Sequence, residues 1–304
     1  MRTDCHQHLW PAELVDALRE RTRPPYLRGW TLHLVGEPPC EVDPAAHDVS
    51  ARRRLTGDED RVDRVLLSLS SPLGLEHLPG EEAAPLLAAW HTGALALGGP
   101  FGVWAAAGVH DLDPAALAEV LAHDRVVGLQ LPATVLGDPA GVDRLAPLLA
   151  ELARVDKPLL VHPGPAPAAD TAGLPAWWPA LVPYVNQLHA AWLAWHVRAR
   201  VDHPALRTAF VALAGLAVLH HERLAGRGGA LGRLDPLVHY ETSSYGPRAV
   251  DAVVRVVGVD PLVAGADRPY AELFDPTPVP GFGAAFTHAL TVANPHHLLH
   301  GGPR

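Results

Sequence analysis

The stretch KPLLVHPG (residues 157–164) has the pattern of a buried parallel strand that ends in a chemically active side chain. Its apolar residues follow one another without alternation, which is typical of a strand covered on both faces. His162 comes where this apolar run meets a Pro-Gly turn. The stretch therefore predicts a strand that carries an imidazole at its carboxyl end.

Seven other stretches are also predicted strands, and helical spacing lies between several of them. The strands are expected at 2–9, 64–71, 101–109, 125–133, 206–215, 237–246 and 261–270, and helices at 113–124, 140–156, 186–204 and 246–260. The pairs Asp113-Pro114 and Asp43-Pro44 read as helix starts, with Asp as N-cap and Pro in the first turn.

Eight apolar strands that alternate with helices predict a parallel sheet of the α/β class. At 304 residues, a closed (βα)8 TIM-like barrel fits best, as a single domain over residues 1–304. A doubly wound open sheet is the alternative, but no G-x-G-x-x-G turn follows the first strand.

Composition limits the partners and the compartment. Hydrophobic residues make up 48% of the chain, the formal net charge is -9, and there are two cysteines, Cys5 and Cys40. The negative charge argues against nucleic acid and anionic membranes as partners. With no apolar run long enough to span a bilayer and no disulfide framework, a cytoplasmic protein that binds a small molecule is expected.

Two long segments are expected on the carboxyl-terminal face of the barrel, where active sites are built. They are residues 20–60, rich in Pro and Arg, and residues 163–184. Trp177, Trp178 and Tyr184 in the second segment favour a lid or pocket wall over a plain surface loop.

The polar residues at the strand ends predict a metal site. His6 and His8 lie on one face of the first strand, His162 ends the fifth, and Asp267 ends the eighth. In a barrel these ends surround one axial pocket, so three imidazoles and one carboxylate would converge there. Such a nitrogen and oxygen set suits one catalytic divalent ion, with zinc as the first choice and manganese, cobalt or iron as alternatives. The ion would activate water, and Asp267 would accept its proton.

These motifs resemble the amidohydrolase superfamily, in the branch of aminocarboxymuconate semialdehyde decarboxylase and the amidohydrolase 2 proteins. DCHQHLWP (4–11) is similar to the opening D-x-H-x-H, LLVHPG (159–164) to the strand-five histidine, and VAGADRPY (263–270) to G-S-D-x-P. ANPHHLLHG (293–301) is similar to the final N-A-x-x-L-L segment, with Pro295 replacing the usual Ala. The resemblance implies that His6, His8, His162 and Asp267 are metal ligands, and it is compatible with a homodimer.

The chain departs from the superfamily at two strands. Strand four carries Gln130, and Lys157, the only lysine in the chain, starts strand five, so no carboxylated lysine bridges two metals. One metal is therefore expected. At the end of strand six, where the branch carries a histidine that polarises substrate or moves protons, this chain has Leu213.

Several other residues are candidates for the pocket or its support. Glu241 is either a carboxylate that orients a ligand histidine or an exposed strand-end residue. His220 and His221 either fold back into the pocket or pack on a helix at the surface. Trp104, Trp177, Trp178 and Tyr184 suggest a flat or apolar substrate. An arginine of the first loop, Arg23 or Arg28, would suit a substrate carboxylate.

Three functions remain open at this point. The leading one is a metal-dependent hydrolase that activates water against an ester, lactone or amide. The second is a non-oxidative decarboxylase or hydratase of an aromatic or unsaturated carboxylic acid, against which Leu213 counts. The third is a catalytically impaired barrel that keeps its ligands and binds a small molecule.

Overall fold

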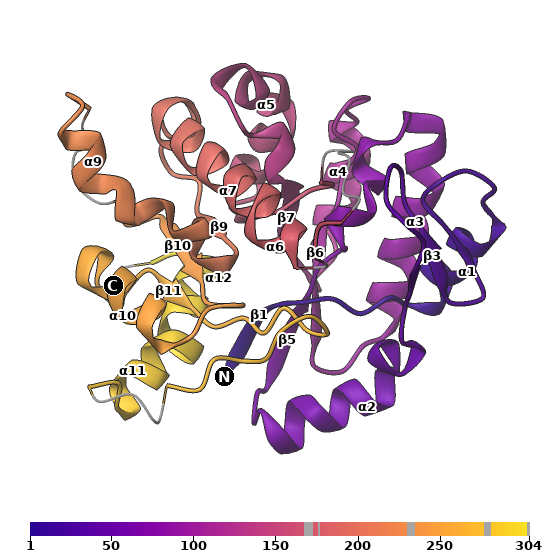
Figure 1. Ribbon diagram of the computed structural model, residues 1–304, viewed down its shortest axis with the longest axis horizontal. Helices are drawn as coiled ribbons and strands as arrows, with labels where there is room; N and C mark the ends of the chain where they lie inside the picture. Colours follow the sequence, from indigo (N-terminus) through magenta and orange to yellow (C-terminus); the bar gives the residue numbers. More distant parts are fainter. Residues whose placement is uncertain (167–172, 176, 230–234, 277–280, 303–304) are drawn as a thin grey trace.

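The computed structural model describes residues 1–166, 173–175, 177–229, 235–276 and 281–302. It contains eight parallel strands in sequence order, which confirms the expected number and direction. In Figure 1 these strands lie at the centre, with α3, α5, α7 and α10 around them. The strands are β1 Thr3–Gln7, β5 Arg64–Leu67, β6 Phe101–Ala105, β7 Val126–Pro132, β8 Leu159–His162, β9 Thr208–Phe210, β10 Val238–Glu241 and β11 Leu262–Val263.

Backbone hydrogen bonds between the first and the eighth strand close the sheet into a barrel. The amide of Cys5 donates to the carbonyl of Ala264 at 2.8 Å, and that of Asp267 donates to the carbonyl of His6 at 2.9 Å. A parallel bridge joins Gln7 to Arg268. The open, doubly wound alternative is therefore wrong.

Helices cover the outside of the barrel, close to the predicted positions. Every residue of β6, β7 and β8 is buried, as continuous apolar runs require. The helices are α1 Ala12–Glu20, α2 Val49–Arg54, α3 Gly80–Ala96, α4 Pro114–Leu121, α5 Pro139–Arg154, α6 Trp178–Leu181, α7 Pro183–Ala194, α8 Arg200–Asp202, α9 His221–Ala225, α10 Pro247–Val257, α11 Ala284–His288 and α12 Asn294–His300. None of the helices in the described ranges is both long and apolar enough to cross a membrane.

The long segment after the first strand contains structure of its own. It forms a three-stranded antiparallel sheet of β2 Tyr26–Arg28, β3 Thr31–His33 and β4 Cys40–Glu41. A short 3-10 helix at Pro44–His47 follows, and the side chain of Asp43 accepts from the amide of Ala45, as its N-cap role predicts. Much of the second long segment, 167–172 and 176, lies outside the described residues.

The strand predicted at 206–215 is much shorter than expected. It ends at Phe210, because Leu213, Ala214, Gly215 and Leu216 adopt left-handed backbone angles within the turn that follows. The run turns the chain away from the strand direction, which its apolar composition did not reveal.

The N-cap of α4 offers a direct test of the local prediction. Asp113 Oδ1 accepts a hydrogen bond from the amide of Ala116 at 2.9 Å. We expect Asp113→Ala to lower the free energy of unfolding by about 1 kcal/mol, because that amide loses its partner. Glu119→Ala, at an exposed site of the same helix, is the control and should change stability little or raise it slightly. Urea denaturation of both variants measures the difference, and equal stabilities would contradict the capping role.

Candidate metal centre

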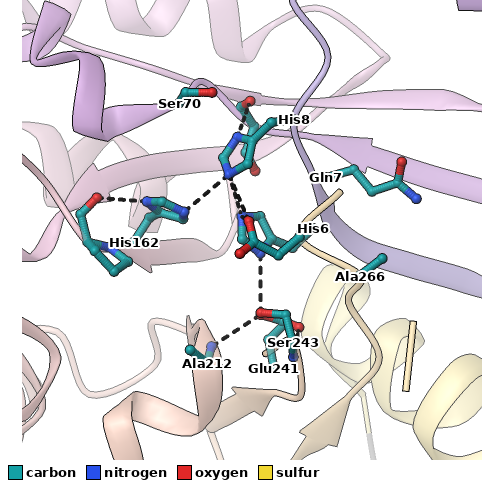
Figure 2. Close-up of polar contacts among 12 residues, drawn as sticks. His6, Gln7, His8, Ser70, His162, Ala212, Glu241, Ser243 and Ala266 are labelled. Carbon is teal, nitrogen blue, oxygen red and sulfur yellow. Dashed lines mark hydrogen bonds and ion pairs between the residues drawn. The ribbon is translucent and has the colours of Figure 1, made fainter. Parts of the chain in front are cut away.

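Four side chains from three strand ends meet at one point of the barrel. His6 lies on β1, His8 follows it, His162 ends β8, and Asp267 lies just beyond β11. One ligand atom from each lies within 4.8 Å of all the others. Figure 2 shows the three imidazoles turned toward one another, with Glu241 beside His6. The structure thus brings together the four residues that the sequence selected.

The oxygen atoms around the imidazoles fix the positions of their protons. Nδ1 of His8 lies 3.0 Å from the carbonyl oxygen of Ser68, and Nδ1 of His162 lies 2.7 Å from that of Pro163. Nδ1 of His6 lies 3.3 Å from Oε2 of Glu241. Since a carbonyl oxygen can only accept, Nδ1 of His8 and of His162 carries the proton, and we assign it to Nδ1 of His6 as well, facing the Glu241 carboxylate.

This assignment leaves three Nε2 lone pairs facing one another. Nε2 of His8 lies 3.1 Å from Nε2 of His6 and 3.2 Å from Nε2 of His162. Oδ1 of Asp267 is 3.2 Å from Nε2 of His8 and has no hydrogen-bond partner among the described residues. Acceptors that face acceptors are stabilised by a shared cation, so the cluster fits a divalent metal ion.

Burial keeps the imidazoles neutral, as metal ligation requires. Removal from water lowers the pKa of His6 to about 3, against the opposing effect of Asp267. Burial, together with the neighbouring His6 and His8, also lowers the pKa of His162 well below its ordinary value. The lone pairs are therefore free for a metal at neutral pH.

Glu241 supports the cluster from behind and is not an exposed strand-end residue. Its carboxylate is fully buried, and besides His6 it accepts from the Ser243 hydroxyl at 2.7 Å and the Ala212 amide at 3.2 Å. Burial raises its pKa to about 7. Gly265 makes room for this carboxylate, since a Cβ there would lie 2.3 Å from Oε1. The contact with Nδ1 of His6 makes Glu241 a positioning residue.

Three of the remaining pocket candidates, Trp104, Arg23 and Arg28, are engaged away from the cluster. Trp104 is fully buried, and its Nε1 donates to the carbonyl of Cys5 at 3.0 Å, so it supports β1 from inside the core. Arg23 is mostly exposed and pairs with Glu82 at 2.7 Å. The guanidinium of Arg28 donates to the backbone carbonyls of Arg19, in the last turn of α1, and of Arg21. Tyr184, by contrast, lies near the cluster, where burial, together with the neighbouring Glu37, Tyr270 and Asp267, raises the pKa of its phenol.

His220 and His221, which the sequence left either in the pocket or at the surface, lie on the outside of the barrel. The ring of His220 packs edge-on against His189 with centroids 5.0 Å apart, and both His220 and His221 line an external hollow beside Trp192. Of the two alternatives left open by the sequence, the structure agrees with packing at the surface, since the left-handed turn after β9 carries both residues outward. Trp177 is 55% exposed and lies 6.0 Å from Trp178, centroid to centroid.

A buried carboxyl group that the sequence did not single out is hydrogen-bonded near Gln130 of β7, through Ser71. Glu76 accepts from the Ser71 hydroxyl, which in turn accepts from Nε2 of Gln130 at 2.8 Å. Burial raises the pKa of Glu76 to about 7. Lys157, the only lysine in the chain, precedes β8 and donates to the carbonyls of Leu121 and Val126. No lysine therefore lies at the carboxyl end of β7 to bridge two metals. Nothing in the local pattern around Glu76 distinguishes it from a surface acid.

Tyr270 is another neighbour that sequence reasoning passed over, although it closes the quoted motif VAGADRPY. Its ring packs edge-on against His8 with centroids 5.8 Å apart. Tyr270 is 65% exposed as a residue, yet partial desolvation of its phenol, together with the nearby Asp267, raises the pKa of that group. A neutral hydroxyl therefore stands beside the cluster at neutral pH.

The raised pKa of Glu76 predicts a pH-dependent stability. Between pH 4.5, its ordinary pKa, and about 7, the folded chain holds a proton that the unfolded chain has released. Stability from this group is therefore lost as the pH rises through that window. We expect Glu76→Gln to show a smaller fall in Tm across it, while exposed Glu119→Gln should keep the wild-type slope. Parallel slopes for wild type and Glu76→Gln would contradict the assignment.

The cluster also predicts metal binding directly. We expect about one divalent ion per chain by elemental mass spectrometry, lost in His8→Ala and retained in His288→Ala, an exposed histidine on α11. Glu241→Gln should weaken metal affinity about 10- to 100-fold, because it loosens the orientation of His6. A wild-type chain that takes up no zinc or manganese on incubation would refute the site.

Comparison with solved structures supports the fold of this site. No protein-family model matches the sequence, and no curated protein matches it. IDCase from Metarhizium anisopliae is 16% identical, with a TM-score of 0.77 over 98% of this chain and 97% of that chain. The 5-carboxyvanillate decarboxylase from Novosphingobium aromaticivorans, complexed with manganese and 4-hydroxy-3-methoxy-5-nitrobenzoic acid, is 18% identical, with a TM-score of 0.72 over 98% and 96%.

A third structure bears on the family resemblance. An amidohydrolase II is 18% identical, with a TM-score of 0.72 over 98% of this chain and 99% of that chain. At these identities the comparisons show the fold: the chain has the barrel that this amidohydrolase and these decarboxylases share.

Proposed function

We propose that the chain is a metal-dependent decarboxylase of an aromatic or unsaturated carboxylic acid. The observation that carries the proposal is the set of three converging Nε2 lone pairs and one unpartnered Asp267 oxygen. The full-length likeness to decarboxylases, one of them with manganese and an aromatic acid, supports this substrate class. Cytoplasmic localisation and a homodimer stay predictions.

One divalent ion would be held by His6, His8, His162 and Asp267. Mixed nitrogen and oxygen ligands suit both zinc and manganese. The manganese in the 5-carboxyvanillate decarboxylase makes manganese the first ion to test, with zinc beside it. When bound, the ion supplies the positive charge that draws electron density from the substrate. Arg23 and Arg28, the cations expected for the substrate carboxylate, are engaged elsewhere.

Asp267 is the residue of the cluster that can move a proton. Its Oδ1 faces the imidazoles, so Oδ2 is left for the proton. In the proposed reaction the C–C bond to the carboxylate breaks, its electron pair stays on the substrate carbon, and carbon dioxide leaves. Protonated Asp267 donates its proton to that carbon. Water then returns a proton to Asp267, and the hydroxide that remains combines with carbon dioxide as bicarbonate. The reaction thus needs a single proton donor, which delivers one proton to the substrate carbon that loses its carboxylate.

A hydrolase on the same metal is the second candidate. Asp267 could instead accept a proton from water during attack on an ester, lactone or amide. The leaving group of an amide then needs a proton too, and Leu213, in the turn after β9, offers none. A barrel that binds a small molecule without turnover is the third candidate.

Product analysis separates these functions. The manganese- or zinc-loaded protein is incubated with hydroxylated aromatic acids and, separately, with esters and lactones. We expect carbon dioxide release from an acid, lowered about 10²- to 10⁴-fold in Asp267→Asn. Asp143→Asn, at an exposed aspartate on α5, is the control and should keep full activity.

Other outcomes contradict the decarboxylase proposal. Acid release without carbon dioxide would establish the hydrolase, and tight ligand binding without any product would favour the binding protein. Undiminished carbon dioxide release by Asp267→Asn would remove Asp267 from the proton step.

A further inference from the structure

A second cavity lies at the opposite end of the barrel from the metal cluster. It has a volume of about 320 Å³ and is lined by residues that include Thr3 and Arg64, at the amino-terminal ends of β1 and β5. His296, His297 and His300 of α12 line its other side. These are the histidines of the closing motif, which the proposed function does not use.

Arg64 lies half-buried at the wall of this cavity. Its guanidinium has no hydrogen bond or ion pair to the residues that the structure describes. It lies beside Gly102 of β6, where a Cβ would come within 3.2 Å of Nη2. A guanidinium presents five donors and keeps its charge at any physiological pH. Partial burial of an unpaired cation costs free energy, so a binding partner from solution is expected.

The surroundings of Arg64 favour a negatively charged partner. His296 and His300 are one helical turn apart, with ring centroids separated by 5.0 Å. Partial burial lowers the pKa of His300, and the neighbouring His296, Arg64 and Arg207 lower it further. None of the described lining residues is acidic. Arg207 is already bound to Asp156 and to the carbonyl of Leu298, which leaves Arg64 as the cation to be neutralised.

We propose that this cavity binds a tetrahedral oxyanion, the phosphate group of a small molecule. The guanidinium and the imidazoles together offer more donors than a carboxylate can accept, and they match the oxygens of a phosphate. A metal ion on the His296 and His300 pair is the poorer fit, because the cation would face Arg64 and Arg207. This site lies at the other end of the barrel from the metal cluster and does not depend on the proposed decarboxylase.

Titration of the metal-loaded protein with inorganic phosphate tests the site by calorimetry. We expect saturable binding that weakens about tenfold or more in Arg64→Gln, because hydrogen bonds between charged groups are lost. His300→Gln should weaken it by a smaller factor, and Arg64→Lys should restore part of it. Arg255→Gln, an exposed arginine paired with Asp251 on α10, is the matched control and should bind as wild type.

Imidazole NMR signals give a second readout that a purely structural role of Arg64 would not move. Phosphate should raise the pKa of His300, because the anion offsets the charges of Arg64 and Arg207. The proposal is overturned if phosphate does not bind, or if binding is unchanged in both Arg64→Gln and His300→Gln. Binding that is lost in His8→Ala but retained in Arg64→Gln would place the anion at the metal cluster and also overturns it.

Discussion

The hydrogen bonds that close the barrel between β1 and the segment after β11 also assemble the metal cluster. The amide of Asp267 donates to the carbonyl of His6, which sets the carboxylate beside the imidazoles. Asp267 adopts a left-handed φ of 55°, which costs about 1–2 kcal/mol for a residue other than glycine. The buried carboxylate of Asp4 accepts from the amides of both His6 and Ala266 and holds the same seam together. Fold closure and site formation are thus one event, since opening this seam would separate the ligands.

The cluster places hydrogen-bond acceptors next to one another, and their mutual repulsion lowers the stability of the folded chain. Each imidazole is fixed by an oxygen behind it, from Ser68, Pro163 or Glu241, so none can rotate its proton into the gap without losing a hydrogen bond. Such a site is organised before the ion arrives, and ion binding then stabilises the folded chain by mass action. The burial that lowers the pKa of His6 has the same effect, because protons compete poorly with a metal for these nitrogens.

The sequence predicted the strands and the ligands because both follow from local pattern and parallel topology. Continuous apolar runs mark buried parallel strands, and their carboxyl ends must converge, so His6 and Asp267 could be placed together from opposite ends of the chain. Glu76 and Arg64 could not be singled out, since their meaning depends on burial beside residues that are distant in sequence. The direction of the chain after β9 was equally hidden. Left-handed angles at Leu213 and its neighbours decide it, and apolar composition carries no signal for them.

The turn after β9 has Leu213 where the branch that the sequence resembles carries a histidine, and the four side chains of the cluster still converge. Leu213 is fully buried and offers no proton, yet the adjacent amide of Ala212 donates to Glu241, which in turn accepts from His6. This strand end therefore still orients a ligand, through a backbone group that almost any residue supplies. What it no longer supplies is a second acid or base. If Asp267 moves the proton, as proposed, a reaction that places one proton on one carbon needs fewer proton-transferring groups than one that must both activate water and protonate a leaving group. In the sequence comparison, Leu213 counted against a decarboxylase. The contacts around it count more heavily against amide hydrolysis.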